Sequence, residues 1–238
     1  MHCSGSVNVN FREFEELINS GVREISLTED VILDDGEKGK YEEGIEINKD
    51  NLIIDGNNNA IDGCMKAPLL IINASNIMLK NILFKNSYCE YSGAAIDNRD
   101  KLIIENCQFA DNSSDDLGGA IYNASNSKLV IKKSIFKKNR ADFGGAIFID
   151  SDSILNLIDS IFESNSSEFE GGAIYNKSKL QIFRSSFDKN ASFKGGAIYT
   201  EDIINVKDCD FKNNIASDGN DIESENNEYL SIINCNFD

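Results

Sequence analysis

A glycine-rich segment that returns at a nearly constant interval constrains the fold of this chain more than any other feature. Five copies follow one another at spacings of 24 to 27 residues: Gly93-Ala94-Ala95-Ile96, Gly118-Gly119-Ala120-Ile121, Gly144-Gly145-Ala146-Ile147, Gly171-Gly172-Ala173-Ile174 and Gly195-Gly196-Ala197-Ile198. A degenerate sixth copy starts at Gly219. A unit this short cannot bury a hydrophobic face alone, so its copies must stack on one another. The repeat therefore predicts a solenoid.

A second element lies between the glycine-rich segments and has the form apolar-x-apolar-x-x-small-x-Phe, as in Leu102, Ile104, Cys107 and Phe109. Residues two apart share one face of a β-strand, so each apolar pair predicts a short strand. The step of three between Ile104 and Cys107 breaks this alternation, which predicts a corner between them. With the glycine-rich segment as a further strand, each repeat is expected to contain three short strands and three corners.

Stacking such repeats in register pairs every strand in parallel, so the sequence predicts an all-β, single-domain parallel β-helix of roughly eight or nine coils. Two columns of identical residues are predicted to form structural ladders inside it: Phe109, Phe136, Phe162, Phe187 and Phe211, and Asn112, Asn139, Asn165, Asn190 and Asn214. Stacked amides can bond along such a column. Because these asparagines are expected to point inward, the Asn-x-Ser patterns at three of them are not expected to be glycosylated.

The two ends of the chain differ. Phe11, Phe14, Leu17 and Ile18 recur at helical spacing, which predicts an amphipathic helix that caps the first coil. The chain stops inside a repeat at the other end, so we expect an excerpt of a longer array or a short natural end. We expect a monomer, or end-to-end self-association through the uncapped C-terminal coil.

We divide the chain into an N-terminal tail at 1–9, the capping helix with irregular early coils at 10–92, and the repeat coils at 93–238. The last two parts are expected to form one continuous solenoid domain. No secretory signal and no apolar stretch long enough to span a membrane is visible, so no direct membrane insertion is expected.

Amino-acid composition argues against several classes of function for this chain. The formal net charge of −17 disfavours nucleic acid and other polyanions as partners. The only histidine is His2, which removes most general-base chemistry. The six cysteines are far apart, and several occupy the small inward position of the repeat, so we expect mostly buried, free thiols, no metal site and no cofactor.

One column of aromatic residues is the first candidate for a ligand-binding surface. If Ile121 points inward, the next residue points outward, and the outward position holds Tyr122, Phe148, Tyr175 and Tyr199 in four consecutive coils. At about 4.8 Å per coil these rings would form an external stripe. Aromatic faces are a common platform for sugars and for protein partners. The alternative role is cross-strand stacking that only stabilises the sheet.

The loop before each glycine pair is the second candidate, because it varies in length and sequence on a rigid scaffold. Its copies are Asp115-Asp116-Leu117, Asp142-Phe143, Phe169-Glu170 and Phe193-Lys194.

An enzyme of the polysaccharide lyase or glycoside hydrolase class is the rival hypothesis, since such chemistry uses paired carboxylates. Its candidate acids are Asp115, Asp116, Asp142, Asp150 and Asp152. They are scattered among similar repeats without a distinctive basic partner, so no catalytic residue is assigned. A structural spacer within a larger surface protein is a further alternative.

The pairing of Gly-Gly-Ala-Ile with Phe-x-x-Asn resembles the repeats of chlamydial polymorphic outer membrane proteins. The run Ile-Asn-Lys-Asp-Asn-Leu-Ile-Ile-Asp-Gly at 47–56 is similar to the opening of adhesin-like β-helix proteins from methanogenic archaea. The resemblance covers residues 10–238. It implies a right-handed parallel β-helix, displayed extracellularly or at a cell surface, that acts as a non-enzymatic adhesin-like module toward glycans or surface proteins.

Overall fold

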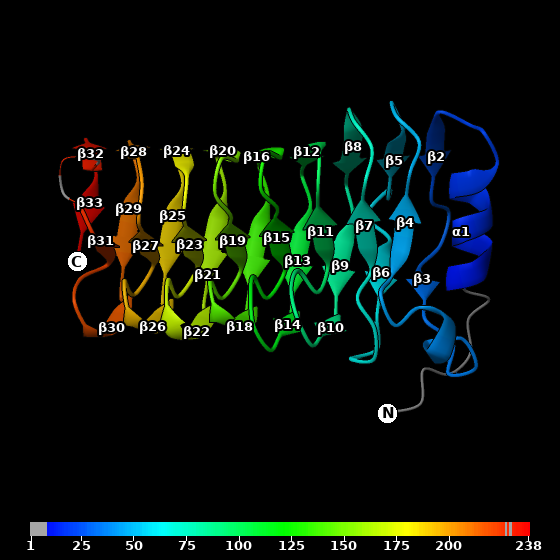
Figure 1. Cartoon of the computed structure of the whole chain (residues 1–238), viewed down its shortest axis with the longest axis horizontal. Helices are drawn as coiled ribbons and strands as arrows, with labels where there is room; N and C mark the ends of the chain where they lie inside the picture. The colour runs from blue at the N-terminus through cyan, green and yellow to red at the C-terminus, as the bar shows by residue number, and fades with distance from the viewer. Residues whose placement is uncertain (1–8, 227, 229) are drawn as a thin grey trace.

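The computed structural model describes residues 9–226, 228 and 230–238, and it forms one parallel solenoid of about 9 coils (Figure 1). Each regular coil passes in turn through four parallel sheets, which we name A to D. Residues 1–8 of the expected tail, with Cys3 among them, lie outside the described residues, and Val9 begins the first strand. The predicted all-β parallel β-helix is confirmed.

Sheet A contains the phenylalanine of each repeat, and sheet B contains the paired apolar residues that precede it. Sheet A comprises β1 (Val9–Asn10), β3 (Val31–Ile32), β6 (Ala60–Asp62), β9 (Leu83–Lys85), β13 (Gln108–Ala110), β17 (Ile135–Lys137), β21 (Ile161–Glu163), β25 (Ser186–Asp188), β29 (Asp210–Lys212) and β33 (Asn236–Phe237). Sheet B comprises β2 (Glu24–Ser26), β5 (Ile53–Asp55), β8 (Ile77–Lys80), β12 (Lys101–Glu105), β16 (Lys128–Lys132), β20 (Ile154–Ile158), β24 (Lys179–Phe183), β28 (Ile204–Lys207) and β32 (Leu230–Ile233).

Sheet C contains the end of each glycine-rich segment. It comprises β4 (Ile45–Ile47), β7 (Leu70–Ile72), β11 (Ile96–Asn98), β15 (Ile121–Asn123), β19 (Ile147–Ile149), β23 (Ile174–Asn176), β27 (Ile198–Thr200) and β31 (Ile222–Ser224). The three strands that the sequence predicts for each repeat are therefore present.

The structure adds a fourth strand, which the sequence did not predict, after the asparagine of each regular repeat. These strands form sheet D: β10 (Tyr88–Cys89), β14 (Ser113–Ser114), β18 (Arg140–Phe143), β22 (Ser166–Glu170), β26 (Ala191–Lys194) and β30 (Ile215–Asp218). Sheets B and D lie on opposite sides of the solenoid, along the upper and lower edges of Figure 1.

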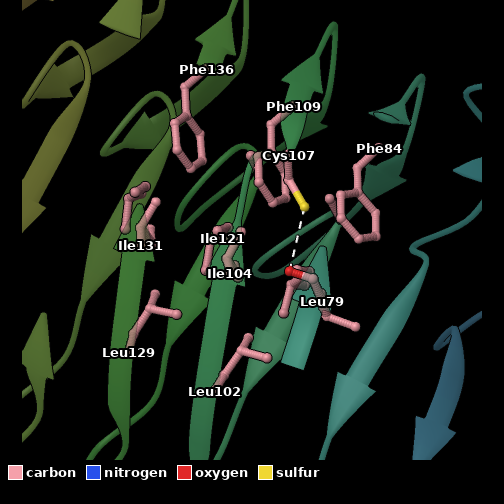
Figure 2. Packing of buried hydrophobic residues seen from close by; sticks show 14 of the residues in the cluster. Leu79, Phe84, Leu102, Ile104, Cys107, Phe109, Ile121, Leu129, Ile131 and Phe136 are labelled. Atoms are coloured by element: carbon pink, nitrogen blue, oxygen red, sulfur yellow. Dashed lines mark hydrogen bonds between the residues drawn. The ribbon is translucent and has the colours of Figure 1, made fainter. Parts of the chain in front are cut away.

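The core consists of columns of identical side chains. Phe109, Phe136 and Phe162 are fully buried, and successive rings lie 4.6 Å apart with interplanar angles of 2°. Figure 2 shows this column beside the leucines and isoleucines of sheet B. The break in alternation between the two apolar pairs is a corner with a left-handed residue, since Asn106 has a φ of 53°. Each predicted phenylalanine of the ladder is buried.

The asparagine ladder is a continuous chain of buried hydrogen bonds. Asn165 donates from Nδ2 to Oδ1 of Asn190 at 2.9 Å and to the carbonyl of Phe136 at 3.0 Å. Its own Oδ1 accepts from the Nδ2 and the backbone N–H of Asn139 at 2.9 and 3.0 Å. Every polar atom of the side chain is thus satisfied without water, which is what burial of an amide requires. The inward orientation of Asn112, Asn165 and Asn190 is confirmed, since all are 0% exposed.

The glycine pair is explained by close backbone packing. Gly144 has a φ of 64°, a conformation that side chains with a Cβ rarely adopt. A Cβ on Gly145 would lie 2.3 Å from the carbonyl oxygen of Gly172 in the next coil. The two glycines therefore allow the chain to turn tightly from sheet D into sheet C while the coils stay in contact.

Helix α1 (Phe11–Asn19) covers the first coil, as predicted (Figure 1). A capping box starts it, in which Asn10 accepts from the Glu13 N–H at 2.9 Å and Glu13 accepts from the Asn10 N–H at 3.0 Å. The expected apolar face needs one correction, because Leu17 is 43% exposed while Phe11, Phe14 and Ile18 are buried. A short 3-10 helix, η1 (Lys38–Lys40), lies in the following loop.

Four described cysteines are unlinked thiols, as expected. Cys89, Cys107, Cys209 and Cys235 are free, and Cys107 and Cys209 are buried. Burial raises the pKa of the Cys107 thiol to about 12. This thiol donates to the carbonyl of Leu79 at 3.5 Å, as drawn in Figure 2.

Candidate functional site

The aromatic stripe lies on the outer face of sheet C, in the register that the sequence predicts. Tyr122 pairs with Phe148, Phe148 with Tyr175, and Tyr175 with Tyr199. Successive ring centroids are 5.8, 4.9 and 5.1 Å apart. The four residues are therefore aligned along the solenoid axis as expected.

The expectation that this stripe stands exposed is wrong. Phe148, Tyr175 and Tyr199 are only 2%, 5% and 5% exposed, and Tyr122 is half-buried. Residues at the corner where sheet D leads into sheet C cover them. Leu117 and Phe143 pack against the stripe, and the Phe143 ring meets Tyr175 edge-on with ring centroids 5.7 Å apart. The stripe is thus a small second core outside the sheet.

The tyrosine hydroxyls of the stripe are also occupied. Tyr122 donates to Asp150 at 2.7 Å, Tyr199 donates to Glu225 at 2.8 Å, and Tyr175 donates to Glu201. Each acceptor belongs to the following coil. Burial and then these hydrogen bonds hold the pKa of all three tyrosines above their ordinary value. These contacts fix the hydroxyls within the fold and support the stabilising role that we weighed against binding.

The second candidate, the segment before each glycine pair, holds the aromatic side chains that do reach the surface. The expectation that it is a loop is wrong, because Phe143, Phe169 and Phe193 lie at the ends of the sheet D strands β18, β22 and β26. Phe169 is 42% exposed and Phe193 is 49% exposed. Phe169 stacks on Phe143 with ring centroids 5.2 Å apart, and Phe143 and Leu117 are half-buried. We name Leu117, Phe143, Phe169 and Phe193 the aromatic ledge. The sequence signal that could have indicated its covering role is the apolar residue directly before Gly118 and Gly144.

Carboxylates lie beside the aromatic ledge. Following the register of sheet D, Asp115, Asp142 and Glu168 occupy equivalent outward positions in three consecutive coils. Burial, together with the charges of Glu168, Asp116 and Asp115, raises the pKa of Asp142 above its ordinary value. Burial likewise raises the pKa of Glu170. The ledge therefore combines ring faces, which pack on apolar or sugar surfaces, with carboxylates that accept hydrogen bonds or meet cations.

The five candidate catalytic acids do not form one group. Asp115, Asp116 and Asp142 lie on the sheet D side, whereas Asp150 and Asp152 lie at the turn between sheets C and B. Burial alone would raise the pKa of Asp150, but hydrogen bonds from Tyr122, Ser151 and Ser125 hold it below its ordinary value. Within the part of the chain that the structure describes, no cluster of three or more His, Cys, Asp or Glu side chains is arranged to hold a metal ion.

Across the described residues, no helix has the length and apolar character to cross a membrane. At the last coil, Ile233 is 50% exposed and Phe237 is 45% exposed. Both are on strands at the open edge of their sheets, β32 and β33.

Parallel sheets that stack identical side chains coil upon coil define this molecule as a parallel β-helix. The family model described as right-handed beta helix region matches residues 38–187, and the chain belongs to this family. The family model of the Chlamydia polymorphic membrane protein repeat matches residues 184–201, a segment that holds one Phe-x-x-Asn and one Gly-Gly-Ala-Ile motif. No curated protein and no solved structure matches the chain.

Proposed function

We propose that this protein is a non-enzymatic, adhesin-like module of a cell surface, and that it binds a glycan or a protein partner through the aromatic ledge. The observation that carries the proposal is the exposure of Phe169 and Phe193 beside a column of carboxylates. Exposed rings on a rigid scaffold gain free energy when a partner covers them, and nearby carboxylates orient that partner. The similarity of residues 184–201 to the polymorphic membrane protein repeat supports display at a surface.

The original binding hypothesis placed the ligand on Tyr122, Phe148, Tyr175 and Tyr199. The ledge replaces that location, because three of those rings are covered. The stripe keeps an indirect role, since it supports Phe143 from below and Phe143 stacks on Phe169. Recognition thus takes place at the corner where sheet D leads into sheet C, with the contact on the ends of the sheet D strands.

The test is a glycan and protein array probed with the wild-type chain and with Phe169→Ser/Phe193→Ser. The matched control is Val22→Ser/Ile161→Ser, which removes apolar side chains that are 43% and 42% exposed elsewhere on the surface. We expect array signals that the ledge variant loses and the control variant keeps, without released products. Binding that both variants keep would place recognition elsewhere. Released products would show that the protein is an enzyme of the polysaccharide lyase or glycoside hydrolase class instead. An array without signals would favour a structural spacer within a larger surface protein.

A further inference from the structure

The outward face of sheet B differs from the rest of this acidic molecule, because its last five strands carry no carboxylate. Over β16, β20, β24, β28 and β32 the outward residues are Lys128, Val130, Lys132, Ile154, Asn156, Ile158, Lys179, Gln181, Phe183, Asn205, Lys207, Ser231 and Ile233. We name this set the basic face. In a chain with a net charge of −17, thirteen such positions without one acid mark a segregation of charge.

The four lysines of the basic face have no partner among the described residues. Several lysines elsewhere on the solenoid pair with an acid one coil away, as Lys137 does with Glu163 at 3.1 Å and Lys80 with Asp55 at 3.1 Å. No ion pair or side-chain hydrogen bond within the described chain involves Lys128, Lys132, Lys179 or Lys207. The amides of Asn156, Gln181 and Asn205, which stack in one column between the lysines, are likewise without a side-chain partner there.

Acids do occur at the rims of the basic face. Asp152 and Asp202 lie in the turns before its strands, and Asp159 and Asp208 lie in the turns after them. Asp159 is already paired with Arg184 at 2.7 Å. The flat centre of the face, where a partner would rest, therefore keeps its positive charge.

The opposite side of the solenoid has the complementary character. Glu90, Asp115, Asp142 and Glu168 form an outward column next to sheet D, and Phe193 continues that column. Burial, and after it the charges of Glu168, Asp116 and Asp115, raises the pKa of Asp142 above its ordinary value. Sheets B and D lie on opposite edges of the molecule in Figure 1.

Both sides share one spacing, because each column advances by one coil, about 4.8 Å, per residue. The carboxylates on one molecule can therefore meet the lysines on another without a mismatch that grows along the axis. On the basic face the lysines alternate with apolar residues, since Lys128 and Lys179 lie on either side of Ile154 in one column. Apolar side chains also face each other in such a contact, with Phe169 and Phe193 on one side and Ile158 and Phe183 on the other. The overall negative charge does not prevent this, because exposed charges are screened beyond about 8 Å at physiological ionic strength.

We propose that the partner recognised by the aromatic ledge and its carboxylates is a second copy of this chain, docked through its basic face. This inference rests on the proposed function and names the partner of the same surface. The two contacting faces are different and lie on opposite sides, so the contact is heterologous and continues from copy to copy. The result is a side-by-side row of solenoids, distinct from the end-to-end association expected at the last coil.

Charge reversal of one face at a time tests the proposal. Lys128→Glu/Lys179→Glu cancels the net charge of the basic face, and Asp142→Lys/Glu168→Lys cancels the net charge of the column formed by Glu90, Asp115, Asp142 and Glu168. The control Lys138→Glu/Lys212→Glu makes the same charge change outside both faces, at exposed residues near sheet A. The measurement is the weight-average mass by sedimentation, over a range of protein concentration at low and high salt.

We expect the mass of the wild type and of the control to rise with concentration and to fall with added salt. Each reversed variant should stay monomeric, with an association constant at least tenfold lower. Their equimolar mixture should associate again, because the intact carboxylate column of one variant meets the intact basic face of the other. A wild type that remains monomeric throughout, or a mixture that fails to assemble, would overturn the inference. Assembly that is lost on Phe237→Ser, which lies outside both faces, but not on charge reversal would establish the end-to-end contact instead.

The outcomes separate this inference from the proposed function. If the wild type is monomeric while the array still shows binding that Phe169→Ser/Phe193→Ser abolishes, the ledge binds another partner and only the self-recognition fails. If neither assembly nor any array signal depends on the ledge, the proposed function fails as well.

Discussion

Removing one rung of the asparagine ladder tests the reasoning about the core most sharply. In Asn165→Ala the backbone N–H and the Nδ2 of Asn139 each lose an acceptor, and the carbonyl of Phe136 loses a donor. Asn139 and Asn165 are 0% exposed, so water cannot replace these bonds without opening the coil. At about 1–3 kcal/mol for each orphaned buried donor, the free energy of unfolding should fall by about 2–6 kcal/mol.

The matched control for this change is Asn205→Ala, because Asn205 points outward on sheet B and makes no side-chain hydrogen bond among the described residues. Its expected effect is within about 0.5 kcal/mol. Urea unfolding followed by circular dichroism gives the free energies, and native-state hydrogen exchange shows whether the loss is confined to neighbouring coils, as stacked repeats allow. Equal effects of the two substitutions would refute the ladder as a source of stability.

Three further expectations concern the core, the thiols and the tyrosines. Phe162→Ala, in the middle of the stacked rings, should lower the free energy of unfolding by about 3–5 kcal/mol in the same urea assay, and a loss below about 1 kcal/mol would contradict its buried position. Alkylation of the native protein near pH 8 should modify half-buried Cys235 well before buried Cys107, whose pKa is raised to about 12; equal rates would contradict the packing. Burial, and then the hydrogen bond to Glu201, holds the pKa of Tyr175 above the value of about 10 expected in the unfolded chain. The contribution of the Tyr175 hydroxyl to the free energy of unfolding is therefore complete below pH 10 and is lost as the pH rises further. Tyr175→Phe should therefore flatten the alkaline loss of stability, and an unchanged slope would show that Tyr175 does not titrate differently on folding.

The ladders could be predicted from the sequence because identical residues recur in phase. Once Phe109 and Phe136 are assigned to the same position of successive coils, parallel strand pairing requires their rings to stack on each other, as they do in the structure. Sheet D could not be predicted in the same way. Its strands are as short as Ser113–Ser114 and vary in composition, so they carry no alternating apolar signal.

The candidate site shows the limit of predicting exposure from the inward–outward alternation of strand residues. The alternation correctly placed Tyr175 on the outside of sheet C, but an outward residue is exposed only if nothing else covers it. Phe143 covers Tyr175 from the end of strand β18, 32 residues earlier in the chain, a contact that depends on how the preceding coil folds back. The net charge does not show how charges are distributed over the surface. The sum of −17 includes the basic face, whose charged residues are Lys128, Lys132, Lys179 and Lys207.

The most direct test of the account is hydroxyl-radical footprinting of the wild-type chain, free and bound to the partner that the array or the assembly assay identifies. Recognition by the aromatic ledge predicts that oxidation of Phe169 and Phe193 falls several-fold on binding, while oxidation of Ile161, which is 42% exposed on sheet A, is unchanged. Phenylalanines that stay as reactive in the complex as in the free protein would contradict the account.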